Sequence, residues 1–111
     1  MSTLTSTLEL TAMQASAERA CRLMKVLTNP DRLMILCQLT QAEKCVSELE
    51  KSLSIMQPTL SQQLTVLRKE ELVTTRREGK NIYYRFTSPQ ALAIMEVLYS
   101  QFCKQSKGKK S

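Results

Sequence analysis

The stretch Val46–Arg68, VSELEKSLSIMQPTLSQQLTVLR, decides the fold. It predicts two short helices joined by a tight turn, the helix-turn-helix arrangement that places its second helix in a DNA major groove. In the first helix, Leu49 and Leu53 are four residues apart and form one apolar face. Ser47 and Glu50 have the spacing of a capping box, which predicts that this helix begins near Ser47.

The second helix, after a turn at residues 54–56, has an apolar side and a polar side. Leu60, Leu64 and Leu67 recur at i, i+4 and i+7 and predict the inward side. Pro58 is compatible with the first turn, where N–H groups have no intrahelical partner. Amide side chains can pair bidentately with adenine, and hydroxyl groups can contact bases or phosphates. The candidate DNA contacts are Gln57, Thr59, Ser61, Gln62, Gln63 and Arg68. A solvated face or a protein-binding face is the alternative, and salt-dependent DNA binding would distinguish them.

A β-hairpin is predicted directly after this helix. The runs Leu72–Arg77 and Ile82–Phe86 are rich in β-forming residues, and the turn between them contains Gly79. Alternation in the second run predicts one packed face and one solvated face. Basic side chains surround the tip: Arg76, Arg77 and Lys80. A basic hairpin that follows a recognition helix is typical of the wing of a winged helix-turn-helix, so these three residues are also candidate DNA contacts.

Two further helices are predicted before the helix-turn-helix. The first extends from about Thr11 to Leu27, where apolar residues have helical spacing. The second has Asn29 as its N-cap and Pro30 at its first position, and it ends near Thr40. Its expected inward stripe consists of Leu33, Leu36, Cys37 and Thr40.

The last predicted helix begins at Ser88 and Pro89 and ends near Gln105. From Ala91 to Cys103 it is apolar on almost every side, so most of its surface must be buried. A single domain of 111 residues has no second layer to cover it. We therefore expect a homodimer, in which this helix packs on the first helix of a second copy. The expected fold is mainly α with a small β-hairpin wing, one domain over residues 1–111 with flexible ends at 1–10 and 105–111.

Charge is distributed unevenly along the chain. Residues 1–50 contain five Lys and Arg against six Asp and Glu, a net charge of −1, whereas residues 51–111 contain eleven against four, a net charge of +7. This excess favours a polyanion such as double-stranded DNA as partner. A membrane surface would suit a basic chain too, but no apolar run approaches the roughly 20 residues of a membrane span. Because the N-terminus shows no secretory signal, we expect a cytoplasmic protein with reduced or reactive cysteines.

Four short motifs are informative together: Asn29–Leu33 (NPDRL), Ile35–Cys37 (ILC), Leu60–Leu64 (LSQQL) and Leu67-Arg68. With them the chain resembles the ArsR/SmtB family of bacterial dimeric winged helix-turn-helix repressors, over most of its length. Within that family it is most similar to the thiol-based branch that includes BigR, SqrR and HlyU. Gln63 stands where the family usually has His, and Met56 where a capping Ser is common, so the resemblance does not imply a particular operator sequence.

The resemblance also implies a role for two of the four cysteines. Periodicity alone would describe Cys37 and Cys103 as inert core residues. Their positions match the cysteine pair of the thiol-based branch. The resemblance therefore implies that persulfides or other reactive sulfur species oxidise them to a disulfide or a short polysulfide bridge, and that the bridged repressor leaves its operator.

Other chemistry has little support. The chain contains no His, which excludes His-ligated zinc and His-based catalysis. Metal-sensing relatives have a Cys-Val-Cys motif where this chain has Cys45-Val46-Ser47, so a sparse soft-metal site at Cys21 and Cys45 is the alternative to two incidental thiols. A thiol-redox enzyme is the competing class, but neither a Cys-x-x-Cys motif nor a Gly-rich phosphate loop is present. We expect no catalytic residue, metal or cofactor.

Overall fold

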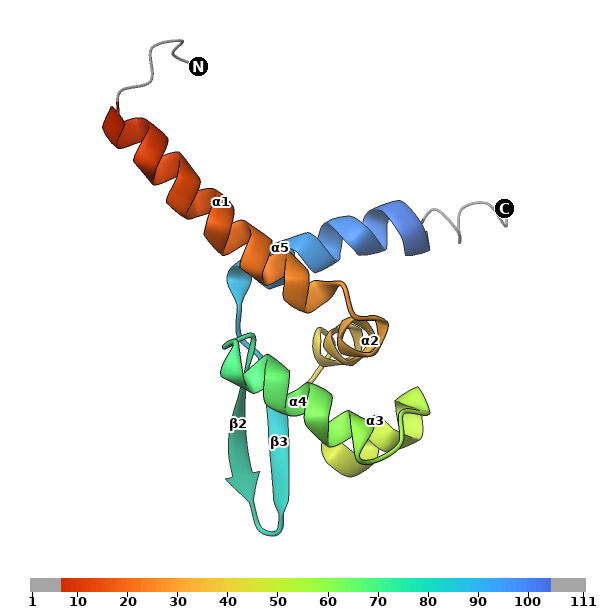
Figure 1. The fold of residues 1–111 in the computed structure, drawn as a ribbon. Helices are drawn as coiled ribbons and strands as arrows, with labels where there is room; N and C mark the ends of the chain where they lie inside the picture. Colours follow the sequence, from red (N-terminus) through yellow and green to blue (C-terminus); the bar gives the residue numbers. More distant parts are fainter. Residues whose placement is uncertain (1–6, 105–111) are drawn as a thin grey trace.

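The computed structural model describes residues 7–104 and has the expected winged helix-turn-helix fold, mainly α with a small sheet (Figure 1). The elements follow in the order α1 (Thr7–Leu27), α2 (Pro30–Leu39), β1 (Lys44–Cys45), α3 (Val46–Leu53), α4 (Thr59–Lys69), β2 (Val73–Glu78), β3 (Asn81–Phe86), α5 (Pro89–Leu98) and the π-helical segment η1 (Tyr99–Lys104). Helix α1 begins four residues before the expected start. The rest of the predicted flexible ends, residues 1–6 and 105–111, lies outside the described residues.

The core lies between α2, the helix-turn-helix and the base of the wing. Leu60, Leu64 and Leu67 of α4 are fully buried there, as the spacing predicted. The inward stripe expected for α2 is partly wrong. Its buried residues are Ile35, Leu36 and Leu39, whereas Leu33 and Cys37 are half-buried and Thr40 is exposed. The physical reason is that α2 contacts α1, α3, α4 and β3, so it is enclosed on several sides rather than along one stripe.

The ends of the helices show which capping predictions are correct. Asn29 Oδ1 accepts a hydrogen bond from the Arg32 N–H (3.0 Å), and Ser88 Oγ accepts from the Ala91 N–H (3.1 Å), as expected for N-caps. The capping box expected at Ser47 and Glu50 is wrong. Helix α3 begins at Val46, and the Glu48 carboxylate accepts from the Cys45 N–H (3.0 Å). Pairing of β1 holds Cys45 in an extended conformation, so the helix starts directly after it.

The wing belongs to a three-stranded antiparallel sheet of order β1-β3-β2. Glu78 pairs with Asn81, which leaves Gly79 and Lys80 as a two-residue turn at the tip. Gly79 has φ +64°, a conformation that favours glycine in such turns. Strand β1 was not predicted, because a two-residue strand has no periodicity to detect. Its Cys45 pairs with Tyr83 and so joins the helix-turn-helix to the wing.

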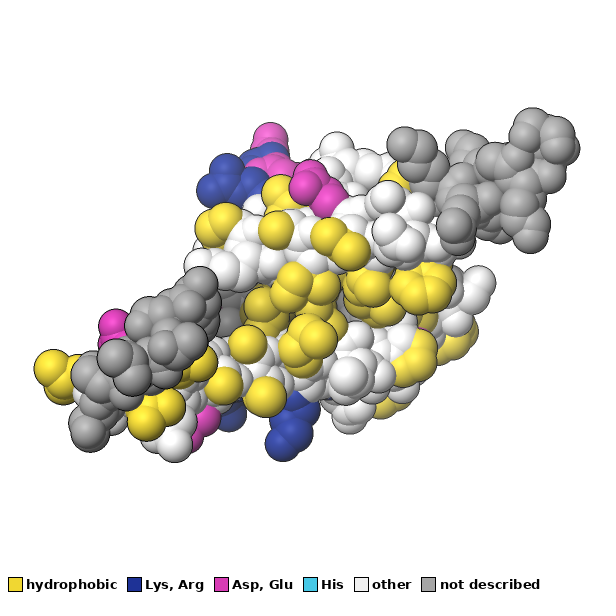
Figure 2. Space-filling model, turned by 90° about the horizontal axis from the view of Figure 1, so that it is seen from above, with side chains coloured by type: hydrophobic (Ala, Val, Ile, Leu, Met, Phe, Trp, Pro, Cys, Tyr) yellow, Lys and Arg dark blue, Asp and Glu magenta, His cyan; other side chains and the backbone are white. Residues whose placement is uncertain are grey.

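Helices α1 and α5 extend away from this core (Figure 1). Residues 8–22 of α1 are all exposed, and only Val26 and Leu27 at its end are buried. In α5, Ala91 and Met95 are buried while the other side chains are half-buried or exposed, so this chain alone does not cover the helix. Figure 2, a view of the molecule from above, shows hydrophobic side chains gathered across the surface that faces the viewer. The large apolar side chains exposed on α1, α5 and η1, which we call together the apolar face, are Leu8, Leu10, Met13, Met24, Leu92, Val97, Tyr99 and Phe102. No helix in the described part of the chain is long and apolar enough to span a membrane.

Candidate nucleic-acid interface

Helix α4 presents a polar surface opposite its buried leucines. Exposed side chains occupy the side away from the core: Gln57 just before the helix, then Ser61, Gln62, Thr65, Arg68 and Lys69 along it. Thr65 was not among the predicted contacts, although its spacing of four from Ser61 places both on one side. Thr59, a predicted contact at the start of α4, is half-buried and so less exposed than these residues. The surface is uncharged at the start of α4 and positive at its end, where cations also interact favourably with the helix dipole.

Gln57 is held against the start of this helix. Its Oε1 accepts a hydrogen bond from the Ser61 N–H (3.2 Å) and another from the Ser61 hydroxyl (2.6 Å). Pro58, at the N-cap position, has no N-capping side chain, so the Gln57 amide satisfies one of the unpaired N–H groups of the first turn. The side chain expected to contact DNA thus also has a capping role.

Gln63 is half-buried like Thr59, but it alone among the predicted contacts on α4 is hydrogen-bonded to α2. Arg32, in the first turn of α2, donates from Nη1 to Gln63 Oε1 (2.9 Å). The same guanidinium donates from Nε to the Val26 carbonyl (2.7 Å) and from Nη2 to the Lys25 carbonyl (3.4 Å). Arg32 therefore connects the end of α1, the start of α2 and the recognition helix, a role that the sequence motif did not reveal.

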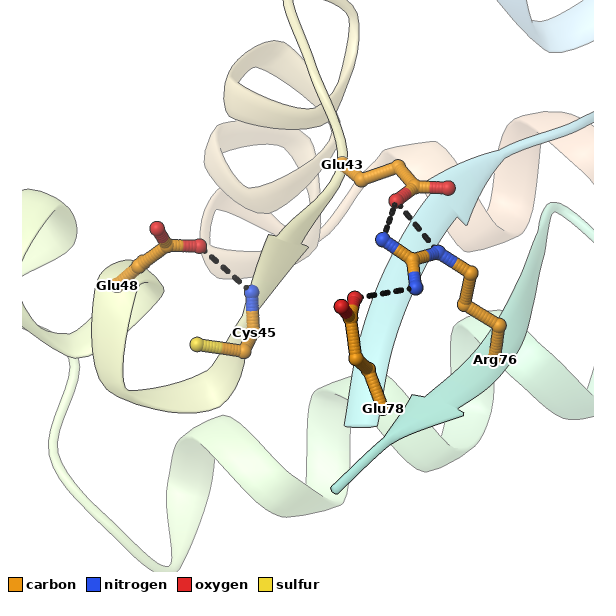
Figure 3. A network of polar contacts seen from close by, with 5 residues as sticks. All are labelled: Glu43, Cys45, Glu48, Arg76 and Glu78. Carbon is orange, nitrogen blue, oxygen red and sulfur yellow. Dashed lines mark hydrogen bonds and ion pairs between the residues drawn. The ribbon is translucent and has the colours of Figure 1, made fainter. Parts of the chain in front are cut away.

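The three basic residues of the wing have unequal surroundings. Arg77 and Lys80 are exposed at its tip. Arg76 instead pairs with two carboxylates, Glu43 (2.8 Å) and Glu78 (2.7 Å), as Figure 3 shows. Its guanidinium also lies over the Tyr83 ring, 4.8 Å from the centroid. The hydrogen bond from Arg76 lowers the pKa of Glu43 below its usual value. Arg76 thus joins β2 to the segment before β1, and its charge is largely compensated.

The four cysteines are all free thiols in very different environments. Cys37 of α2 is half-buried, Cys103 of η1 is exposed, Cys45 is buried and Cys21 is exposed. Burial raises the pKa of the Cys37 thiol, and the negative charge that Cys103 can carry raises it further. The two thiols belong to different elements, Cys37 to α2 and Cys103 to η1. Cys45 Sγ lies 3.3 Å from Ser47 Oγ. Within residues 7–104, no group of three or more Cys, Asp or Glu side chains could hold a metal ion.

Together, the recognition helix, the basic wing and their connection through β1 define a winged helix-turn-helix DNA-binding protein. The sequence profile described as "Bacterial regulatory protein, arsR family" matches residues 29–75. A biofilm growth-associated repressor of Agrobacterium fabrum is 50% identical over 94 residues, which cover 85% of this chain and 80% of that protein. The chain belongs to the ArsR family of bacterial regulatory proteins and is a DNA-binding transcriptional regulator.

Two solved structures extend this similarity to the fold. The structure of reduced HlyU from Vibrio cholerae has a TM-score of 0.79 and 37% sequence identity, and the match covers 83% of this chain and 97% of that one. The second is a homodimeric winged helix-turn-helix DNA-binding domain from Mycobacterium bovis, a possible ArsR-family regulator. It has a TM-score of 0.72 and 27% identity, with 86% and 89% of the two chains covered.

Proposed function

We propose that this chain is a homodimeric repressor that releases its operator when reactive sulfur joins Cys37 to Cys103. The observation that supports the sulfur switch is the placement of these two thiols. They lie on different elements, α2 and η1, and the charge of Cys103 is the second cause, after burial, of the raised pKa of Cys37. A cytoplasmic location stays a prediction.

The apolar face supports the dimer. A groove of about 910 Å³ is lined by α1, the segment 69–72 at the end of α4 and the start of α5, with Leu23, Met24 and Ile94 among its lining residues. Large apolar side chains exposed on neighbouring helices are typical of a protein–protein interface. The similar Mycobacterium bovis domain is homodimeric. Two copies related by a two-fold axis would bring their recognition helices to successive major grooves, about 34–36 Å apart.

The two thiols suit a stepwise reaction with a persulfide, RSSH. Cys103 is exposed and meets the reagent first. Its thiolate attacks the outer sulfur, which gives a Cys103 persulfide and releases RS⁻. The Cys37 thiolate then attacks Sγ of the Cys103 persulfide, which forms the disulfide and expels the outer sulfur as HS⁻. The sum is two thiols and RSSH giving one disulfide, RSH and H₂S; a second RSSH adds one bridging sulfur atom and releases a second RSH.

A bridge at this position would act on the recognition helix through α2. Cys37 and Arg32 lie on the same short helix, and Arg32 is bonded to Gln63 of α4. A covalent bond between α2 and η1 would therefore affect both the element that contacts α4 and the end of the apolar face. To change operator occupancy from about 99:1 to about 1:99, the bridge must favour the released state by about 5.5 kcal/mol. A covalent bond that joins α2 to η1 can supply that energy, whereas the loss of one surface contact cannot.

The test is operator release by single-cysteine variants after treatment with a persulfide donor. Cys37→Ser and Cys103→Ser should bind DNA like the parent when reduced and stay bound after treatment. Cys21→Ser and Cys45→Ser are the matched controls and should still release. Mass spectrometry of the treated parent should show Cys37 and Cys103 joined within one chain. Release by either Cys37→Ser or Cys103→Ser, or release of the parent by zinc alone, would refute the sulfur switch.

A further inference from the structure

The three glutamines at the recognition helix differ in what their amide groups already bind. Gln57 Oε1 accepts two hydrogen bonds from Ser61, and Gln63 Oε1 accepts one from Arg32. Gln62 is exposed, and its amide has no hydrogen bond within the described residues. The glutamines are therefore not equivalent in what they can offer to DNA.

The orientation of the two occupied amides follows from the chemistry of their partners. A guanidinium group and a backbone N–H can only donate. The atom that faces Arg32 must be the oxygen of Gln63, and the atom that faces the Ser61 N–H must be the oxygen of Gln57. In both side chains the NH₂ group is what remains available. No buried side-chain nitrogen or oxygen in residues 7–104 lacks a partner, so the Gln63 NH₂ group is accessible to solvent.

Which amide atoms are free, the oxygen, the nitrogen or both, restricts the bases that each glutamine can recognise. Bidentate recognition of adenine needs the amide oxygen to accept from the N6 amino group and the amide nitrogen to donate to N7. Only Gln62 has both amide atoms free of hydrogen bonds within the described residues; the Gln63 oxygen has a second lone pair, but its bond to Arg32 holds it toward α2. We propose that Gln62 is the adenine-recognising residue of α4, whereas Gln57 and Gln63 contact DNA only as donors, to phosphate oxygens or to acceptors such as guanine O6 and N7 or thymine O4.

Arg32 acts in this proposal as a positioning residue for Gln63. Its guanidinium is fixed by the Val26 and Lys25 carbonyls at the end of α1, so it presents Nη1 to Gln63 from a defined place. Without Arg32, the Gln63 amide could rotate and offer its oxygen instead. The sequence assigned all three glutamines to the same kind of contact, and only the hydrogen bonds distinguish them.

The inference rests on the proposed operator binding, and the test begins there. Full-length reduced protein is used to select duplexes from a randomised pool. In one selected duplex each adenine is replaced in turn by purine, which lacks the N6 amino group, and by 7-deazaadenine, which lacks N7. With the parent protein, both replacements at one adenine of each half-site should weaken binding roughly three- to tenfold. Failure to select any duplex would refute operator binding itself, and with it this inference.

Variants then assign the sensitive adenine. With Gln62→Ala, both replacements at that position should have no further effect. With Gln57→Ala and Gln63→Ala, the matched controls, the sensitivity should persist although overall affinity falls. The proposal is overturned if the parent shows no such adenine, if the sensitivity persists in Gln62→Ala, or if it disappears in Gln57→Ala or Gln63→Ala.

The role of Arg32 is tested by coupling. Arg32→Met should reduce affinity about as much as Gln63→Ala does, and the double variant should be no weaker than either single variant, because the two residues act as one unit. Fully additive losses would refute the positioning role. If Arg32→Met does not fold, Gln63→Glu serves instead, because it keeps an acceptor for Arg32 but has no NH₂ group. Affinity of Gln63→Glu equal to that of the parent would refute the donor role.

Discussion

Adjacent arginines in β2 illustrate how strongly local pairing changes the function of a charge. Arg76 donates to Glu43 and Glu78 and stacks on Tyr83, while Arg77 is exposed. Side chains alternate between the two faces of a strand, so neighbouring arginines point to opposite faces. The Arg76 side chain contacts Glu78, two residues further along β2, and Glu43, just before β1. The basic tip predicted from the sequence therefore contains one positioning arginine, Arg76, beside candidates for phosphate contact.

This difference predicts distinct salt dependences for the two arginines. Arg77→Ala should make the slope of log K against log salt shallower by about 0.9, the value for one lost phosphate contact. Arg76→Ala should change the slope by much less, because its charge is already compensated by two carboxylates. Binding to one duplex over a series of salt concentrations measures both slopes. Equal changes for the two variants would show that Arg76 contacts a phosphate despite its carboxylate partners.

The cysteines should also differ in reactivity. Because the pKa of Cys37 is raised in the folded chain, its thiol stays protonated over more of the pH range and its thiolate fraction grows only as pH rises toward that value. Mass spectrometry after brief iodoacetamide treatment should therefore show alkylation of the exposed Cys103 and Cys21 before Cys37 and the buried Cys45. The Cys37 rate should increase with pH between roughly 7 and 9. Alkylation of Cys37 as fast as that of Cys103 at neutral pH would contradict this order.

Among the elements, those with periodic sequences could be predicted and those fixed by tertiary contacts could not. The spacing of Leu60, Leu64 and Leu67 identified α4, and the caps at Asn29 and Ser88 set the starts of α2 and α5. Strand β1 depends on pairing with β3, a contact between residues far apart in sequence, and this pairing also moved the start of α3. The orientation of the Gln63 side-chain amide depends on Arg32, 31 residues away, so no local sequence pattern could indicate it.

The start of α2 provides a stability test at the scale of one element. Asn29→Ala removes the acceptor for the Arg32 N–H and should lower the free energy of unfolding by about 1 kcal/mol, within a usual range of about 0.5–2 kcal/mol. Asn29→Asp keeps an oxygen acceptor at the N-cap and is the matched control, expected to stay within a few tenths of a kcal/mol of the parent. Urea unfolding of the reduced protein measures both. Equal losses in the two variants would show that the cap does not account for the effect.

At the scale of the whole molecule, the described chain has one part with a closed core and one part whose apolar side chains are largely exposed. The helix-turn-helix and wing have a closed core in which large leucines are fully buried. Helix α1 and the far side of α5, by contrast, leave most of their apolar side chains exposed (Figure 2). Burial of such side chains is the main favourable term in association, so a second copy is the simplest way to complete this half of the molecule. Cys103 lies in η1, at the end of that face, so a bridge to Cys37 would act at the proposed dimer interface.

A charge placed on the apolar face should therefore separate the two copies. Val97 is 58% exposed on α5, and Val97→Glu would bury an unpaired carboxylate in the proposed interface, at a cost of several kcal/mol. Met56→Glu is the matched control: Met56 is 74% exposed, but it lies between α3 and α4, away from α1 and α5 (Figure 1). Sedimentation at micromolar concentration should give about twice 12.6 kDa for the parent and for Met56→Glu, and a monomer for Val97→Glu. Val97→Glu should also lose affinity for a two-half-site duplex more than for a single half-site, because a monomer cannot occupy two successive grooves at once. A monomeric parent, or a dimeric Val97→Glu, would show that this face is not the interface.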